Sequence, residues 1–415
     1  MSISEKDKSQ NASPSNGAGG TVVLGFSGGL DTSYCVKYLG EKGYEVHSII
    51  VNTGGFTEDE LKGIEAHAKR LGVKTHTSID AVRTYYDSII KYLIFGNVLK
   101  NNTYPLSVSA ERLSQALHIA EHAKKLSADA VAHGSTGAGN DQVRFDMIFH
   151  ILIPGTEIIT PIRDLKLSRE QEIDYLKSKG VELNFEKAVY SINKGLWGTS
   201  VGGRETLSSR GMLPEEAWPT QVSRSGSQEV KLEFEKGELK TVDDKNFSHP
   251  SDAIKYLQTL AGPFGVGRDI HVGDTIVGIK GRVGFEAAAP MVIIKAHHAL
   301  EKHVLTKWQL NLKDQLAQFY GNWLHEGQIL DPVMRDIEAF LENSQQCVTG
   351  NVFVQLMPYH FQIIGIESKY DLMNSKFGKY GEMNTDWSGE DVRGFSKIFG
   401  NQTRMWQAIQ KENEK

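Results

Sequence analysis

The sequence predicts an α/β protein in which a parallel sheet covered by helices precedes an α+β domain and a C-terminal helix. Between residues 21 and about 180, short apolar runs alternate with segments of helical periodicity, as is typical of parallel βαβ units. A glycine-rich loop follows each of two apolar runs. After about residue 183, alternating apolar positions and tight turns indicate hairpins instead. Any ligand site of the first part is therefore expected at the carboxyl ends of its strands, where both loops lie.

In the first part, apolar runs predict strands and periodic apolar positions predict helices. The segment 58–71, for example, carries Leu61, Ile64, Ala68 and Leu71 at helical spacing. The strands are expected at 21–24, 46–51, 73–77, 130–132 and 157–160. The helices are expected from 34–39 onward and at 58–71, 109–126 and 168–179.

In the second part, Val230, Leu232 and Phe234 alternate before a turn at Lys236-Gly237, which predicts a hairpin. Further expected elements are strands at 271–279 and 291–296, a long amphipathic helix at 300–323 and a hairpin at 351–367. The last stretch, 389–415, begins as a polar linker and ends as a helix that is too apolar for a free tail. This helix either docks on another subunit or packs on its own domain.

Composition limits the function classes. The 415 residues suffice for two domains, and 40% hydrophobic with 23% charged residues is ordinary for a globular protein. A net charge of −5 argues against a nucleic-acid binder. Cys35 and Cys347 give no disulfide framework, which fits a reducing cytoplasm. Residues 1–20 lack an apolar segment and are expected to be a disordered leader, and no stretch is apolar enough to span a membrane.

The first glycine-rich loop, residues 25–33, reads Gly-Phe-Ser-Gly-Gly-Leu-Asp-Thr-Ser between a strand and a helix. Its glycines let the backbone turn sharply and come close to a ligand. The loop N–H groups and the helix N-terminus then face one point, which suits an anion. No lysine follows the glycines, so this is not the ordinary Walker-type loop. The alternative is a plain strand–helix turn in which Asp31 or Thr32 caps the helix.

The second loop, residues 133–145, packs small residues ahead of a polar cluster at a predicted helix start. Thr136, Asn140 and Asp141 can bind the amine and carboxylates of an amino acid. Arg144 lies one helical turn further on the same face, and the fork of an arginine suits a carboxylate. The alternative is that Asn140 or Asp141 merely caps the helix while Arg144 is a surface charge.

The two loops, together with Pro161-x-Arg163 and Gly265-Val266-Gly267-Arg268, resemble the argininosuccinate synthases, which are PP-loop ATP pyrophosphatases. The resemblance implies an adenine nucleotide alpha hydrolase-like ATP-binding domain at 21–182, a synthetase domain at 183–386 and an oligomerisation helix at 387–415. It implies a ligase of arginine biosynthesis that forms a C–N bond between citrulline and aspartate. The ureido oxygen of citrulline would attack the α-phosphorus of ATP, and aspartate would displace AMP from citrullyl-AMP. ATP with Mg²⁺ and a cytoplasmic homotetramer are also implied.

The resemblance further implies site residues wherever the motifs match. ATP would be held by the first loop, by Val51 beside the adenine and by Gly134. The first-loop residues are Gly25, Phe26, Ser27, Gly28, Gly29, Leu30, Asp31, Thr32 and Ser33. Aspartate would be held by Thr136, Asn140 and Asp141. Citrulline would be held by Tyr104, Ser109, Asn140, Arg144, Ser191 and Ser200, of which the last two lie in a less similar string. No residue is assigned to a metal, and no nucleic-acid or membrane partner is expected.

Three positions depart from the family's pattern. The family usually carries a lysine where this chain has Ala138, and a glutamate and a tyrosine that contact citrulline where this chain has Gly273 and Phe285. Loss of a partner for the α-ammonium group weakens binding. One hypothesis is an N-acylated citrulline, acetyl or succinyl, with Gly273 supplying the extra room. The other, which we favour, is free citrulline with Asp274 or Glu286 taking over the lost role.

Rival function classes fit less well. A pyrophosphatase that modifies transfer RNA generally needs a basic face and often paired cysteines, whereas this chain is acidic and its cysteines lie far apart. A glutamine-dependent amidotransferase needs a catalytic cysteine, and Cys347 stands in an unpromising Gln-Gln-Cys-Val context. A nucleotide-sensing or scaffold protein is a non-enzymatic alternative, which the intact first loop disfavours.

Overall fold

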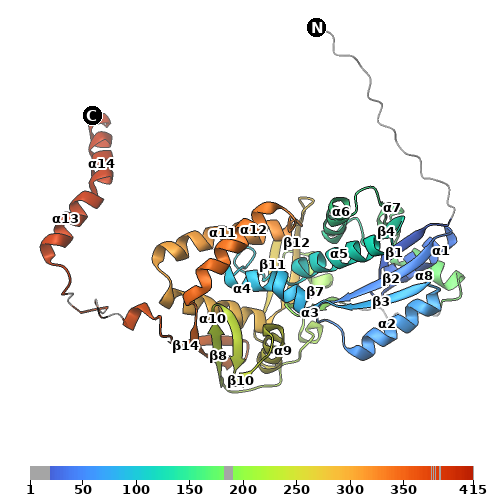
Figure 1. The fold of residues 1–415 in the computed structure, drawn as a ribbon, viewed down its shortest axis with the longest axis horizontal. Helices are drawn as coiled ribbons and strands as arrows, with labels where there is room; N and C mark the ends of the chain where they lie inside the picture. The colour runs from blue at the N-terminus through green and yellow to red at the C-terminus, as the bar shows by residue number, and fades with distance from the viewer. Residues whose placement is uncertain are drawn as a thin grey trace, which may run out of the picture.

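The computed structural model describes residues 19–181, 190–374, 376, 378, 380–382 and 385–414. Figure 1 shows three parts: a parallel-sheet domain, a second domain of sheets and helices beside it, and a helical arm that projects from the second domain. Residues 1–18, most of the predicted leader, lie outside the described residues. So do residues 182–189, where the predicted boundary between the two domains falls.

The parallel sheet consists of β1 (Thr21–Gly25), β2 (Glu45–Asn52), β3 (Thr75–Asp80), β4 (Ala130–Ala132) and β5 (Glu157–Ile159), in the order β3-β2-β1-β4-β5. All neighbouring strands pair in parallel, which confirms the predicted α/β fold. The strand predicted at 73–77 begins only at Thr75. Val73 still belongs to the end of the preceding helix, because its N–H group donates to the carbonyl of Ala68.

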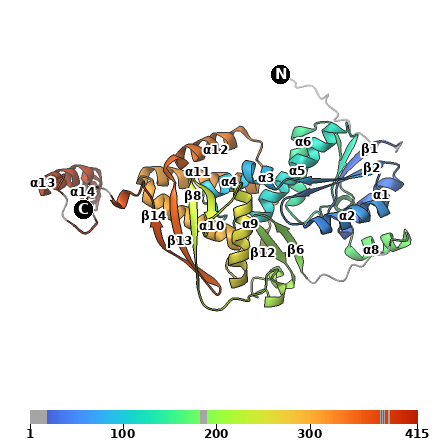
Figure 2. The same ribbon diagram turned by 60° about the horizontal axis from the view of Figure 1, so that its bottom comes forward.

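Helices cover both faces of this sheet (Figure 2). Val22 and Leu24 of β1 pack with α1 (Leu30–Glu41), α2 (Glu58–Leu71) and α8 (Arg169–Ser178). Val23 points to the opposite face and packs with α5 (Ser107–Lys125) and α6 (Asp141–Leu152). Because both faces are covered, the three middle residues of β1 are apolar and fully buried.

The order of the strands positions the two glycine-rich loops. The chain forms β1, β2 and β3 in one direction across the sheet and then returns past β1 to form β4. The loops that follow β1 and β4 therefore leave the sheet at neighbouring strand ends, where the strand order reverses. Open parallel sheets bind their ligands at this place. The fold thus brings both loops to one site.

The second domain contains two antiparallel sheets. One is built from β11 (Arg268–Asp274), β12 (Lys280–Glu286), β7 (Gly198–Gly202) and β6 (Ser191–Gly195), in that order. The other is built from β10 (Lys245–Asn246), β9 (Glu238–Val242), β8 (Gln228–Glu235), β13 (Gly350–Met357) and β14 (His360–Glu367). The longer helices are α9 (Pro250–Ala261), α10 (Ala288–Val304), α11 (Lys307–His325) and α12 (Pro332–Ser344). The two predicted hairpins are confirmed as β8–β9 and β13–β14.

The other elements are short connectors. They are α3 (Val82–Tyr85), η1 (Tyr86–Ile90), α4 (Lys91–Phe95), α7 (Pro161–Asp164), η2 (Arg204–Leu207), η3 (Glu215–Ala217), η4 (Gly262–Phe264), η5 (Gln345–Cys347) and η6 (Leu372–Asn374). None of the described helices combines the length and the apolar character that crossing a bilayer requires.

Three predictions for the second domain are wrong. Residues 291–296 lie in α10 rather than in a strand, because a short apolar run also fits a helix that is buried on several sides. The helix predicted at 300–323 is two helices, since α10 ends at Val304 and Thr306 caps α11 in a capping box with Gln309. The strand predicted at 271–279 ends at Asp274, because a turn follows in which Gly278 has a φ of 83°.

The C-terminal arm contains two helices, α13 (Gly389–Phe399) and α14 (Asn401–Asn413), where the sequence predicts a linker and one helix. None of the described residues in either helix is buried. Both helices lie away from the two domains (Figures 1 and 2). In this structure the arm therefore does not pack on its own domain.

Candidate active site

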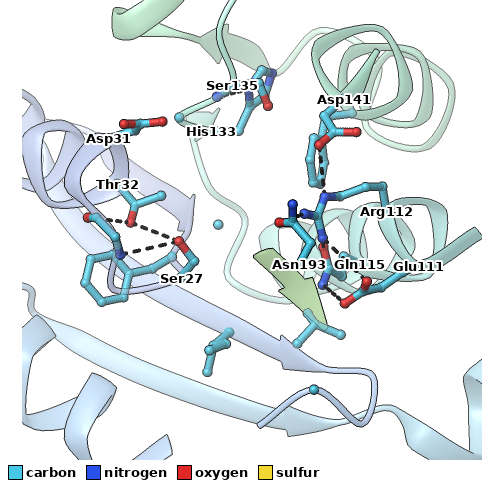
Figure 3. A pocket seen from close by; sticks show the side chains of 18 of the residues that line it. Ser27, Asp31, Thr32, Glu111, Arg112, Gln115, His133, Ser135, Asp141 and Asn193 are labelled. Atoms are coloured by element: carbon cyan, nitrogen blue, oxygen red, sulfur yellow. Dashed lines mark hydrogen bonds and ion pairs between the residues drawn. The ribbon is translucent and has the colours of Figure 1, made fainter. Parts of the chain in front are cut away.

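A cavity of about 920 Å³ lies at the carboxyl ends of the parallel strands and is walled by both glycine-rich loops, α5 and β6. Figure 3 shows Ser27, Asp31 and Thr32 of the first loop on one side of the cavity, with Arg112 and Asp141 on the other. The predicted site residues that line it are Gly25, Phe26, Ser27, Gly29, Leu30, Asp31, Thr32, Val51, Gly134, Thr136, Asp141 and Ser191.

The first loop leaves the N-terminus of α1 open. Gly29 is the N-cap, and no side chain in the described chain caps the helix, so the alternative in which Asp31 or Thr32 is the cap is wrong. The hydroxyls of Thr32 and Ser33 donate instead to the carbonyl of Gly29, at 3.3 and 2.8 Å. The first N–H groups of α1 are therefore available to an anion in the cavity.

Gly28 and Ser33 of the first loop do not line the cavity but face the neighbouring helix α2. Gly28 has a φ of 79°, which favours glycine, and a Cβ there would lie 3.2 Å from Ile64. The hydroxyl of Ser33 is 2.9 Å from Nε2 of His67 on α2. These contacts hold the loop against its neighbouring helix.

The second loop packs directly on the first. A Cβ at Gly134 would lie 3.2 Å from the Cβ of Asp31, so only glycine permits this approach without movement. His133 is held from behind, with Nε2 at 2.9 Å from Asp146, which in turn binds Arg163 at 2.6 Å. Burial disfavours the charge on Asp146, but the hydrogen bonds from His133 and Arg163 outweigh it and lower its pKa. This arrangement gives the Pro161-x-Arg163 motif a structural role.

At the start of α6, Asn140 is the N-cap residue, but neither its side chain nor that of Asp141 caps the helix. The side chain of Asn140 accepts a hydrogen bond from the N–H group of Ile276 at 2.8 Å, which joins the loop to the second domain. The carboxylate of Asp141 binds Nε of Arg112 at 3.0 Å and Nη1 of Arg144 at 3.1 Å. Burial opposes the charge of Asp141, but the two arginines prevail and lower its pKa. Asp141 is thus an ionised carboxylate at the cavity wall.

Arg144 is buried, with 2% of its surface exposed, so the alternative of a surface charge is wrong. Its Nη2 donates to the hydroxyl of Ser109 at 3.0 Å, and its Nε and Nη2 donate to the carbonyl of His325. Tyr104 lies nearby, where its hydroxyl accepts from the N–H group of Val108 at 3.0 Å. Three predicted citrulline residues therefore form one cluster behind the cavity wall.

The two predicted serines of the second domain lie on paired strands. Ser191 on β6 lines the cavity, whereas Ser200 on β7 is buried and lies 3.5 Å from the amide nitrogen of Asn193. Asn193 itself accepts from Nη2 of Arg112 at 2.7 Å. This contact ties the second domain to α5 at the cavity.

Arg112, Glu111 and Asn193 line the cavity but are not among the predicted site residues. The hydroxyl of Thr53 donates to Glu111 at 2.6 Å, and burial raises the pKa of this carboxyl. A usable signal for Arg112 was its position three residues after Ser109, which puts both on one helical face. Asn193 carries no such signal, because it reaches the cavity through the packing of β6 on the distant helix α5, where it binds Arg112.

Two of the three positions that depart from the family pattern, Gly273 and Phe285, are closely packed. A Cβ at Gly273 would overlap Nε2 of His271, so the ring of His271 takes the room that the N-acyl hypothesis assigned to this glycine. Phe285 is buried against Tyr104, with ring centroids 5.4 Å apart. The suggested replacements are paired too: Asp274 binds Lys280 at 2.6 Å and Glu286 binds Arg268 at 3.1 Å. Ala138 is exposed on the second loop.

A parallel sheet that presents an open helix N-terminus to a cavity, at the point where its strand order reverses, defines a nucleotide-binding α/β protein. Comparison with known families is more specific. Residues 21–182 match the arginosuccinate synthase N-terminal HUP domain, and residues 190–406 match the arginosuccinate synthase C-terminal domain. This chain belongs to the argininosuccinate synthase family.

Individual relatives cover nearly the whole chain. It is 37% identical to the argininosuccinate synthase of Methanocaldococcus jannaschii, over 94% of this chain and 98% of that protein. It is 36% identical to the argininosuccinate synthase of Xylella fastidiosa, over 93% of this chain and 96% of that protein. For the protein of the same name from Sulfurisphaera tokodaii, the identity is 33% over 91% and 97% of the two chains.

Proposed function

We propose that this chain is a ligase that condenses citrulline with aspartate to argininosuccinate while cleaving ATP to AMP and pyrophosphate. Family membership and the names of the relatives support this reaction. The structural observation that carries it is a single cavity joining the open N-terminus of α1 to the carboxylate of Asp141. One wall suits phosphate groups and the other suits the charged groups of an amino acid.

The proposed roles of the residues follow from their places. The first loop, 25–33, holds the phosphates, Val51 flanks the adenine, and Gly134 lets the second loop approach the nucleotide. Asp141 receives the ammonium group of aspartate, since a carboxylate that binds two arginines still has acceptor sites left. Thr136 and Asn140 complete the aspartate site. The proposed citrulline residues are Tyr104, Ser109, Asn140, Arg144, Ser191 and Ser200.

In the first step, the ureido oxygen of citrulline forms a bond to the α-phosphorus of ATP. The bond from this phosphorus to the α,β-bridging oxygen breaks, and pyrophosphate leaves with that oxygen. The N–H groups at the start of α1 stabilise the negative charge that builds up on the phosphates. The enzyme's contribution is mainly to hold the two reactants in line.

In the second step, the ammonium group of aspartate first gives a proton to the pyrophosphate released in the first step, and the resulting amine bonds to the activated ureido carbon of citrullyl-AMP. AMP leaves with the former ureido oxygen, and the attacking nitrogen loses its proton to the phosphate of the departing AMP. Free citrulline is favoured over an N-acylated form, because the relatives carry the name of the ordinary synthase and because His271 fills the space beside Gly273.

Mg²⁺ is expected to arrive with ATP. The carboxylate of Asp31 lies at the cavity wall beside the phosphate loop and suits a hard cation. Within the described chain, no group of three or more His, Cys, Asp or Glu side chains could hold a metal ion. The phosphates would therefore supply most oxygen ligands, with Asp31 adding one. The ion would neutralise phosphate charge.

We further infer that the chain forms a homotetramer in which the arm, residues 387–415, docks on a neighbouring subunit. The arm exposes a set of large apolar side chains that its own domains do not cover. They are Phe395, Ile398, Phe399, Met405, Trp406 and Ile409. The two free cysteines, Cys35 and Cys347, support a reducing cytoplasmic location.

The proposal is tested by incubating purified protein with ATP, Mg²⁺, citrulline and aspartate and by measuring AMP, pyrophosphate and argininosuccinate. We expect the three products in equal amounts, and we expect pyrophosphate release to stop when citrulline is left out. Formation of ADP and phosphate, or no turnover with all substrates present, would overturn the proposal.

A further inference from the structure

In the part of the chain that the structure describes, two buried histidines next to the proposed citrulline residues each have one ring nitrogen without a hydrogen-bond partner. His271 on β11 and His325 at the end of α11 are each 7% exposed. The Nδ1 atom of each ring is buried and has no partner among the described residues. A buried polar atom without a partner costs free energy, so such a pair in a native structure calls for an explanation.

Both rings belong to the cluster of Tyr104 and Arg144. The ring of His271 stacks on that of Tyr104, with centroids 5.1 Å apart and planes 25° apart. The ring also lies over Gly273, where a Cβ would overlap its Nε2 atom. The backbone carbonyl of His325 accepts two hydrogen bonds from the guanidinium of Arg144, at 2.9 and 3.1 Å.

The surroundings are electropositive. Burial, Arg144 and Lys100 lower the pKa of His325 to about 3, and burial and Lys100 also lower the pKa of His271, against a smaller opposing effect of Asp269. Both rings are therefore neutral at pH 7, and each has one N–H group to donate. Among the described residues, neither Nδ1 atom has a carboxylate partner: Asp274 binds Lys280, and Asp269 acts on His271 without a hydrogen bond to its Nδ1. The cluster thus has spare donors and matches a ligand that brings a negative oxygen.

We propose that His271 and His325 form a subsite for the α-carboxylate of citrulline, each donating its Nδ1–H group to a carboxylate oxygen. The inference rests on the proposed function and extends it to two residues that the family motifs do not supply. A carboxylate would give both rings their missing acceptor, and its charge would be favourable beside Arg144 and Lys100. Gly273 then serves to admit the ring of His271 rather than a bulky acyl group.

The test compares citrulline with its α-carboxamide, which keeps the ureido group but lacks the anionic oxygen, in the wild type and in H271F. Phenylalanine keeps an aromatic ring to stack on Tyr104, is somewhat larger than histidine, and has no N–H group to donate. We expect H271F to lower kcat/KM for citrulline roughly 10- to 100-fold, mainly through KM, because a charged hydrogen bond is lost. The amide should be a poor substrate of the wild type and should lose less than about threefold in H271F. KM for ATP should stay unchanged.

Two glycine variants approach the same subsite from the backbone. G273A should displace the ring of His271 and raise KM for citrulline. G281A is the matched control, because Gly281 pairs with Gly273 across the two strands and a Cβ there would meet nothing within 4 Å. It should behave as the wild type.

The possible results distinguish a failure of the carboxylate subsite from a failure of the proposed synthase reaction. Wild-type turnover of citrulline, combined with an equal loss for citrulline and its amide in H271F, would overturn the subsite and leave the synthase reaction standing. An unchanged KM for citrulline in both H271F and G273A would do the same. No turnover by the wild type would overturn the proposed function itself.

Discussion

Arg112 and Arg144 both bind the carboxylate of Asp141 and hold it at the wall of the cavity. Arg112 has further partners, since its Nη1 donates to Gln115 and its Nη2 to Asn193. A planar fork holds three separate partners in fixed directions, whereas the three donors of an ammonium group diverge from one atom on a flexible chain. Arg112 is therefore the residue that aligns the aspartate site with the second domain.

R112K should raise KM for aspartate about tenfold or more, because Asp141 and Asn193 lose charge-assisted hydrogen bonds of fixed geometry. Steady-state kinetics with each substrate varied in turn checks this. KM for ATP should change much less, because the first loop does not contact Arg112. The control is R83K, at a largely exposed arginine that does not line the cavity. Equal effects of the two substitutions would contradict the role of Arg112.

The carboxyl group of Glu172 on α8 holds its proton more tightly in the folded protein than in the unfolded chain. Burial, and next the nearby Asp31, raise its pKa to about 8 from an ordinary value of 4.5. Between these two pH values the unfolded chain has lost a proton that the folded chain keeps. Stability therefore falls as the pH rises through this window.

E172Q removes this dependence, because an amide does not ionise. At pH 5 the melting temperatures of E172Q and the wild type should be similar, and at pH 8 that of E172Q should be higher. Thermal unfolding without nucleotide at both pH values checks the prediction. A difference between the two proteins that is the same at pH 5 and pH 8 would contradict it.

At the residue scale, the loop residues were predictable and their partners were not. The glycines and hydroxyls of the first loop stand together in the sequence, so their joint presence at the cavity could be read directly. Asn140 does occupy the N-cap position of α6, but its side chain binds Ile276 of the second domain instead of capping the helix. Asp31 and Asp141 are not caps, since Asp31 lines the cavity and Asp141 binds Arg112. Such partners come from strand pairing and domain packing, which local spacing does not encode.

At the level of helices and strands, the turns and caps that end an element decide whether its bounds can be predicted from the sequence. Strands bounded by turns, such as β8 and β13, were predicted with nearly the right ends. The apolar residues of α10 and α11 fall into one long periodic pattern, yet the helix is interrupted between them at Leu305 and Thr306. The break lies where Thr306 and Gln309 form a capping box, a local signal that the periodicity hides.

T306A should destabilise the protein by about 1 kcal/mol, because the first N–H groups of α11 lose their side-chain acceptor. Urea unfolding followed by circular dichroism measures this free energy. T259A, at an exposed position inside α9, is the control and should change stability by less than about 0.5 kcal/mol. If T306A were as stable as the control, the cap would not be what separates α10 from α11.

At the scale of the whole molecule, the two-part architecture followed from the change of pattern near residue 183, and the structure shows a parallel and then an antiparallel organisation. What the sequence left open was the course of the arm. Its apolar residues are compatible with packing on its own domain or on a neighbouring subunit, and their periodicity does not distinguish between the two. The structure shows the arm away from its own domains.

Deletion of residues 389–415 should reduce the assembly from the proposed tetramer to a smaller species, because the apolar faces of α13 and α14 would no longer bind a neighbour. Sedimentation velocity of the full chain and the truncated chain checks this. Substitution of Phe395 and Ile398 by serine in the full chain should act in the same direction. Two results would contradict the role of the arm. The full chain could sediment as a monomer, or the truncated chain could form an assembly with as many subunits as the full chain.

The proposed reaction depends on one step above all, in which citrulline bound in the cavity is activated by forming a bond to the α-phosphorus of ATP. The most direct measurement uses citrulline labelled with ¹⁸O in the ureido group and mass spectrometry of the nucleotide formed in the presence of aspartate. We expect one ¹⁸O atom in the phosphate of AMP, because AMP departs with the former ureido oxygen. Unlabelled AMP alongside normal argininosuccinate formation would contradict the citrullyl-AMP route.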